Sequence, residues 1–195
     1  MIAKMPIQYI NRKEQMYYLH QGTTKTGKPK YFFSMKAEGN ILEAIPDGYE
    51  IYENPNAQVF LRKIQPKIIT DEEKRIVESG MKKLSRLQDY QIDVKQEIIT
   101  IYTPNQNVNL LSEMLSFSSG DKLKEAETIL KRSISYSPML QFVLIDEPKR
   151  IFITQRYCFL GRIDDWIQVG EPSNLNNLVK NYVKHLGQES FFELH

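Results

Sequence analysis

The sequence predicts an α+β protein in which antiparallel β-hairpins and helices occupy separate stretches of the chain. Four pairs of strand-like segments are each joined by turn residues, and two other segments have the apolar spacing of amphipathic helices. Because hairpins and helices do not alternate one by one, antiparallel sheets are favoured over a doubly wound parallel sheet. We therefore expect antiparallel hairpins with segregated helices.

The chain is long enough for one large domain, or for a small domain joined to a medium one. It has 195 residues, of which 41% are hydrophobic and 11% aromatic, so it can bury a sizeable core. The residue pattern changes at Thr70 from strand-like to helical. We predict a small, mainly β unit over residues 1–69 and an α+β unit over 70–195, and leave open whether they share one core.

The first unit is predicted from aromatic, β-favouring segments. The segments "MYYLH" (16–20) and "KYFFSM" (30–35) flank the turn-rich "QGTTKTGKP" and predict a hairpin with a long loop. Further on, "YEIYE" and "QVFLRKI" are joined by "NPNA", whose Pro55 suits the second position of a tight turn. Residues 16–64 are therefore predicted to form a four-stranded, mostly antiparallel unit.

The second unit is predicted to open with a helix over about 71–88. "TDEE" is a capping box in which the Thr70 hydroxyl and the Glu73 carboxylate each accept a bond from the other's backbone N–H. Two further hairpins are predicted, from "YQIDV" with "EIITIYT" and from "MLQFVLID" with "RIFITQRYCF". One or two helices are expected across 107–133, a short strand at "WIQV", and a last helix that Ser173 caps and Gly187 stops.

The single cysteine indicates a protein of a reducing compartment, and the charge is close to balanced. The net charge is +2, and residues 1–70 contain ten Lys/Arg against six Asp/Glu, a mild basic excess. Cys158 is the only cysteine, which excludes an intrachain disulfide. The first residues, "MIAKMPIQYINRKEQ", lack the apolar stretch of a signal peptide, and no run approaches the roughly 20 apolar residues of a membrane span. We expect a cytoplasmic protein with no membrane partner.

Several kinds of chemistry find no support in the sequence. One cysteine and three histidines cannot form a four-ligand structural zinc site. No glycine-rich phosphate-binding motif and no nucleophile elbow is present. We therefore expect no cofactor, no metal ligand and no catalytic residue.

One enzymatic alternative stays open at the second hairpin. Asp93 and Lys95 have the D-x-K spacing found at the end of a strand in many metal-dependent nucleases, where the carboxylate holds Mg²⁺ and the lysine orients water. Such a site needs a second acid from a neighbouring strand, and the sequence marks none. A metal-dependent nuclease using Asp93 and Lys95 is the runner-up function.

A second acidic feature lies in "GRIDDW". Asp164 and Asp165 precede Trp166, and paired acids can bind a cation or act as acid and base. The favoured interpretation is a turn in which one aspartate accepts backbone hydrogen bonds and Trp166 anchors the next strand.

The first hairpin is the most promising binding surface. Residues 17–36 carry four lysines and no carboxylate, and alternation places aromatic residues on both faces of the two strands. The following segments either cover the second face or leave it exposed beside the lysines, where it can stack bases or pack against a protein. The predicted contact residues are Lys25, Lys28, Lys30, Tyr17, Tyr31 and Phe33. We expect a non-enzymatic binding or accessory module with a protein partner first and nucleic acid second, and we leave its oligomeric state open.

The chain as a whole resembles a group of uncharacterised bacterial proteins. The stretches that carry the resemblance are "KTGKPKYFFS", "IPDGYEIYENPNAQVFLRK" and "RYCFLGRIDDWI". The resemblance implies no activity and supplies no site residues.

Overall fold

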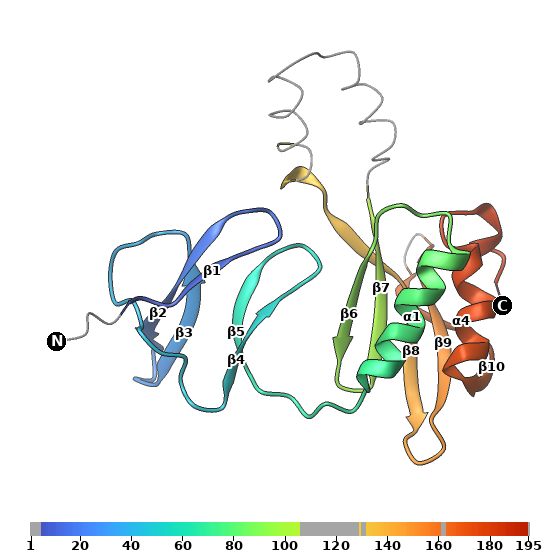
Figure 1. Ribbon diagram of the computed structural model, residues 1–195, viewed down its shortest axis with the longest axis horizontal. Coiled ribbons are helices and arrows are strands. Elements are labelled where there is room, and N and C mark those ends of the chain that lie inside the picture. Colours follow the sequence, from blue (N-terminus) through green and yellow to red (C-terminus); the bar gives the residue numbers. More distant parts are fainter. Residues whose placement is uncertain (1–4, 106–128, 130–131, 161–162, 195) are drawn as a thin grey trace. The chain divides into compact units, whose positions relative to one another are not determined.

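The structure is a computed structural model that describes residues 5–105, 129, 132–160 and 163–194. Contacts divide the chain into two compact units, one within Met1–Ile64 and Met114–Ser133 and the other within Gln65–Glu113 and Ile134–His195. Over the described ranges there are two α-helices and ten strands in three antiparallel sheets (Figure 1). The predicted α+β class with segregated helices is confirmed. Most of the region 107–133, where further helices were expected, lies outside the described residues.

The first unit contains two small sheets. The predicted strand pairs are present, but they do not form one four-stranded sheet, and a short additional strand precedes them. The three-stranded sheet has the order β1-β2-β3 and consists of β1 (Gln8–Ile10), β2 (Met16–Thr23) and β3 (Pro29–Ser34). The second sheet is the hairpin of β4 (Tyr49–Glu53) and β5 (Val59–Lys63).

Two turns of the first unit share one hydrogen-bond pattern. In "NRKEQ" the Asn11 side-chain oxygen accepts from the backbone N–H groups of Lys13 (3.1 Å) and Gln15 (2.8 Å), and Glu14 takes a φ of 58°. In "NPNAQ" the Asn54 oxygen accepts from the second and fourth residues after it in the same way, and Ala57 takes a φ of 62°. The Asn11 amide also donates to the Ala57 carbonyl oxygen (2.8 Å). The two turns are therefore joined, which helps to hold the β4–β5 hairpin against the three-stranded sheet.

The second unit is a five-stranded antiparallel sheet with the order β10-β9-β8-β7-β6. Its strands are β6 (Gln91–Lys95), β7 (Ile98–Pro104), β8 (Tyr136–Asp146), β9 (Ile151–Leu160) and β10 (Ile163–Asn174). The helices of the described chain pack on one face: α1 (Asp71–Leu84), α4 (Leu175–Tyr182) and the short 3₁₀ helices η1 (Val183–His185) and η2 (Glu189–Phe191). β10 is much longer than the predicted strand.

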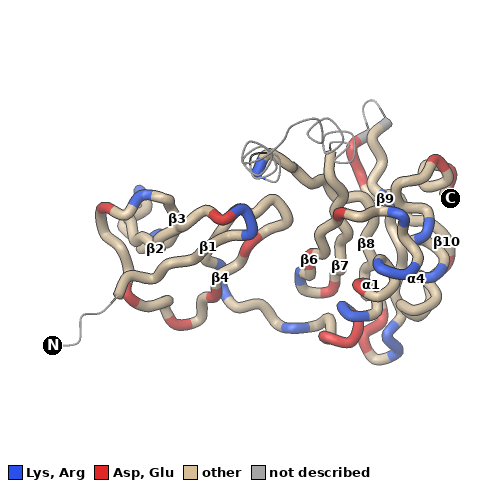
Figure 2. Tube along the Cα trace, turned by 45° about the horizontal axis from the view of Figure 1, so that its top comes forward, with Lys and Arg blue, Asp and Glu red and all other residues tan. Residues whose placement is uncertain are grey.

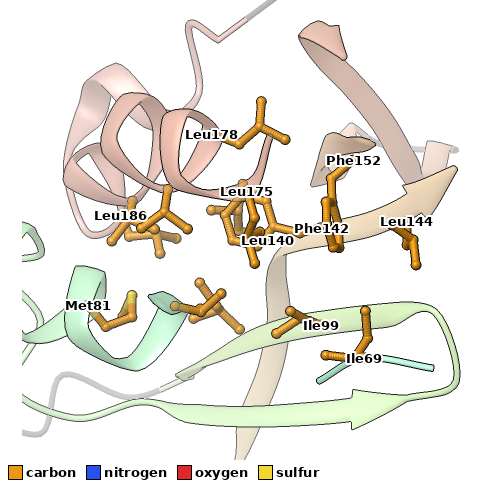
Figure 3. Packing of buried hydrophobic residues seen from close by; sticks show 14 of the residues in the cluster. Ile69, Met81, Ile99, Leu140, Phe142, Leu144, Phe152, Leu175, Leu178 and Leu186 are labelled. Atoms are coloured by element: carbon orange, nitrogen blue, oxygen red, sulfur yellow. The ribbon is translucent and has the colours of Figure 1, made fainter. Parts of the chain in front are cut away.

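The core of the second unit fills the space between this sheet face and the helices. Alternate residues of β8, among them Leu140 and Phe142, belong to this core, and Leu175 of α4 lies beside Leu140 (Figure 3). α1 and α4 also touch each other closely, because a Cβ atom added at Gly80 would lie 2.1 Å from Val179 Cγ1. Glycine at this helical position therefore allows the close helix–helix approach.

The capping box at the start of α1 is confirmed, and its acid has a second partner. The Thr70 hydroxyl accepts from Glu73 N–H (3.2 Å), and Glu73 accepts from Thr70 N–H (2.9 Å). Arg150 donates to both oxygens of the Glu73 carboxylate, at 2.9 and 2.5 Å. Burial alone would raise the pKa of Glu73, but the bonds from Arg150 and Thr70 outweigh it and lower the pKa below its ordinary value.

Two predicted helix boundaries are wrong. α1 ends at Leu84 and not near residue 88, because Ser85 is extended and only its N–H still bonds back to the helix. The last helix is capped by Asn174 and not by Ser173, because the Asn174 side chain accepts from Asn177 N–H at 3.0 Å.

Candidate binding surface on the first unit

The β2–β3 turn holds its lysines in a defined loop. Thr24 and Lys28 close the loop through Thr24 N–H to Lys28 O (2.8 Å) and Lys28 N–H to Thr24 Oγ1 (3.0 Å). Gly27 has a φ of 79°, in the left-handed region that favours glycine. The loop therefore presents its side chains outward from a fixed backbone and is not a loose tip.

The three predicted contact lysines lie at the surface of the first unit. Lys25, Lys28 and Lys30 are all exposed to solvent. Within the part of the chain that the structure describes, none of them forms an ion pair. Figure 2 shows basic positions at this end of the hairpin. The turn is thus a positively charged projection at the end of the sheet.

The three predicted contact aromatics lie on the inner face of the sheet. Phe33 is paired with Leu19, which is completely buried, and Tyr31 is on the same face and meets Tyr49 of β4 edge to face at 5.4 Å between ring centroids. Tyr17 also shares this face, two residues before Leu19. All three rings are half-buried, and the ring of Tyr31 packs against the β4–β5 hairpin. The three rings therefore lie on the face of the sheet that carries the buried Leu19, whereas the lysines are exposed to solvent.

The opposite, outer face of the same sheet is apolar and partly exposed. Ile10 is 61% exposed, and Met16 and Phe32 are each 41% exposed. Tyr18 joins them, with its hydroxyl 3.3 Å from the Met16 sulfur. The pairing register places these side chains on one face, and the strand that carries Phe32 also carries Lys30. We call Ile10, Met16, Tyr18 and Phe32 the outer apolar face.

His20 supports this face and has a structural role. Its ring stacks on Phe32 with centroids 5.4 Å apart, and its Nε2 lies 3.0 Å from the Lys36 carbonyl oxygen. The stack fixes the Phe32 ring while the ring stays partly exposed.

Sequence alternation shows that the first hairpin has two aromatic faces, but not which of them is covered. Ile10, Met16 and Phe32 were not among the predicted contact residues. The signal in the sequence was that residues 10, 16 and 32 are apolar and, like Tyr18, stand at even-numbered positions of their strands. Only the pairing of β1 with β2 brings Ile10 and Met16 together.

The nuclease alternative has part of its geometry in the second unit. The Lys95 ammonium lies 3.1 Å from the Asp93 carboxylate, and the Asp93 side chain is only 9% exposed. On the neighbouring strands, the residues paired in turn with Asp93 are Thr100, Gln141 and Gln155. None of these three side chains carries a charge. No group of three His, Cys, Asp or Glu side chains suited to a metal ion occurs among the described residues. The second acid that this mechanism requires is therefore not found beside Asp93 in the described sheet.

No protein-family model, curated protein or solved structure matches the chain. None of the helices in the described part of the chain is long and apolar enough to span a membrane.

Proposed function

We propose that the protein is a non-enzymatic binding module whose first unit contacts a partner through the β2–β3 loop and the outer apolar face. The observation that carries the proposal is the juxtaposition, on one small sheet, of three exposed lysines without an ion-pair partner among the described residues and an exposed apolar surface. An apolar centre beside a charged rim is the usual composition of a protein interface.

The partner that best fits this surface is a protein with an apolar patch flanked by carboxylates. Single-stranded nucleic acid is gripped by several rings that stack on successive bases. Here Tyr17, Tyr31 and Phe33 are packed inward, and Phe32 is already stacked on His20. The rest of the outer face is largely aliphatic, which suits apolar side chains better than bases.

Site-specific photo-cross-linking tests the surface in cells. A benzophenone amino acid is placed at Phe32 and, as a matched control, at Phe60, which is 45% exposed on β5. We expect an adduct from position 32 that is lost when Lys25, Lys28 and Lys30 are changed to Gln. The control triple variant changes Lys63, Lys82 and Lys83, which are also exposed.

The partner found in this way is then purified and titrated against each variant. The Lys25/Lys28/Lys30 variant should bind more weakly and with a smaller salt dependence, whereas the Lys63/Lys82/Lys83 variant should bind as the wild type does. Equal cross-linking from positions 32 and 60, or equal affinity of the two triple variants, would overturn the proposal. Salt-dependent binding of labelled single- or double-stranded DNA or RNA, lost only in the first variant, would replace the protein partner by nucleic acid.

A further inference from the structure

The sheet of the second unit has a face that no helix of the described chain covers. Along β9, Phe152 and Cys158 are buried on the helical side, so alternation directs Tyr157 and Phe159 to the opposite side. Phe159 is 64% exposed there. A large aromatic side chain with so little packing adds little to the stability of the sheet.

Pairing with β10 completes a two-by-two block on this face. Trp166 lies opposite Tyr157, and Asp164 lies opposite Phe159. Side chains directly opposite each other in an antiparallel pair have Cβ atoms about 5 Å apart. Three rings and one carboxylate therefore occupy the four corners of a single patch.

Tyr157 is in contact with both of the other rings. Its centroid lies 4.8 Å from that of Phe159 and 5.0 Å from that of Trp166, and the planes meet at 67° and 77°. Edge-to-face contacts of this kind turn neighbouring ring planes steeply to each other. The ring of Tyr157 is therefore steeply inclined to the planes of both Phe159 and Trp166.

The carboxylate of the block is held next to the rings. Asp164 lies opposite Phe159 in the strand register, and its carboxylate is the main cause of the raised pKa of the Tyr157 hydroxyl. Asp165 has a different task, because its Oδ1 accepts from the Trp166 backbone N–H at 2.7 Å. This hydrogen bond is the backbone role expected for one of the two acids, but the expected turn is wrong, because both aspartates lie within β10 and pair with β9.

We propose that the block of Tyr157, Phe159, Trp166 and Asp164 binds an alkylated ammonium group. Aromatic faces attract a cation through their quadrupole, and tryptophan does so most strongly. A methylated ammonium loses little hydration when it meets rings, and the nearby carboxylate supplies the opposite charge. The group can come from a free quaternary ammonium compound or from a methylated lysine side chain of a protein.

Trp166 makes the proposal directly measurable because it is the only tryptophan of the chain. Choline chloride is titrated into the full-length protein at constant ionic strength while tryptophan fluorescence is followed. The matched neutral probe is 3,3-dimethylbutan-1-ol, which has the shape of choline without its charge. We expect saturable quenching by choline and at least about fivefold weaker binding of the alcohol. Equal affinity for both probes would overturn the proposal.

Two variants separate the block from general surface effects. Phe159→Leu keeps an apolar side chain but removes the ring, and it should weaken choline binding about three- to tenfold. Phe192→Leu is the matched control, because Phe192 is also 64% exposed in the same unit; it should leave binding unchanged. Asp164→Asn should weaken binding without a loss of folding, which is checked by circular dichroism. Equal effects of the two leucine variants would also overturn the proposal.

The source of the ammonium group is distinguished in the same assay. A short blocked peptide with a central trimethyllysine is compared with choline and with the same peptide carrying norleucine. Tighter binding of the trimethyllysine peptide than of choline indicates a protein ligand, and the reverse indicates a free compound. Failure of both cations to bind overturns this site alone, because the proposed partner surface of the first unit uses other residues.

Discussion

Replacing Arg150 by alanine should destabilise the second unit strongly. The guanidinium donates two bonds to Glu73 and a third, of 3.2 Å, to the Ile68 carbonyl oxygen. Without it, a carboxylate whose side chain is only 10% exposed keeps Thr70 as its partner in the capping box but loses its counter-charge. Breaking a fully buried ion pair costs roughly 3–5 kcal/mol. Because the Arg150 side chain is 33% exposed, so that water replaces part of its role, we expect about 2–3 kcal/mol.

The loss of stability caused by Arg150→Ala should become smaller as the pH falls. In the wild type the lowered pKa of Glu73 gives stability that is present above about pH 4.3, the ordinary pKa of glutamate, and is lost as the pH falls through the lowered value. In the alanine variant burial is no longer outweighed by Arg150, so protonation of Glu73 favours the folded state. The difference in free energy of unfolding between the two proteins should therefore shrink between pH 7 and pH 4.

Urea unfolding followed by circular dichroism measures this difference at both pH values. With a slope of roughly 2 kcal/mol per molar urea, the midpoint should fall by about 1–1.5 M at pH 7. Lys149→Ala is the control, since Lys149 is 77% exposed and lies 3.4 Å from Asp146; it should cost no more than about 0.5 kcal/mol. An Arg150→Ala variant that is as stable as this control, or a difference that grows on acidification, would refute the reasoning.

Three further predictions concern the second unit. Gly80→Ala should destabilise by about 1–3 kcal/mol despite the better helix propensity of alanine, and Val179→Ala in the same chain should recover part of the loss, as a double-mutant cycle in urea would show. A fragment of residues 65–195 should melt cooperatively and at a higher temperature than one of 70–195, because only the longer one keeps the buried Ile69; a molten, dye-binding 65–195 fragment would show that the two units share a core. Plasmid DNA should stay intact in Mg²⁺, and EDTA should leave the melting temperature unchanged; cleavage that disappears in Asp93→Asn would revive the nuclease alternative.

Much of the local structure could be predicted because its causes are local. The capping box at Thr70 and Glu73 needs only four residues, and it marked the start of α1 correctly. The hairpins follow from apolar strands on either side of turn residues. The predicted end of α1 was wrong because Leu87 continues the apolar spacing of the helix, whereas the helix itself ends at Leu84. The reason is tertiary: Leu87 lies close to Gly187, where an added Cβ would be 2.7 Å from it.

The separation of the first unit into two sheets could not be predicted from strand patterns. Those patterns identify hairpins but do not say which hairpin edges pair. Side-chain bonds between Tyr9 and Glu53 and between Asn11 and Ala57 join the three-stranded sheet to the β4–β5 hairpin. These partners are more than 40 residues apart in the chain, so no local pattern contains them.

The same limit explains the choice of contact residues on the first unit. Alternation places Tyr31 and Phe32 on opposite faces of their strand, and the pairing register of the structure adds Tyr17 to the face of Tyr31. Burial is decided by what packs against each face, and the β4–β5 hairpin contributes Tyr49 to the face of Tyr31. Lys25 and Lys28 are exposed because a turn keeps its side chains in water whichever face of the sheet is covered. Charge in a turn is therefore a surface signal that the sequence carries by itself, whereas an aromatic residue in a strand becomes one only when the packing of the whole unit is known.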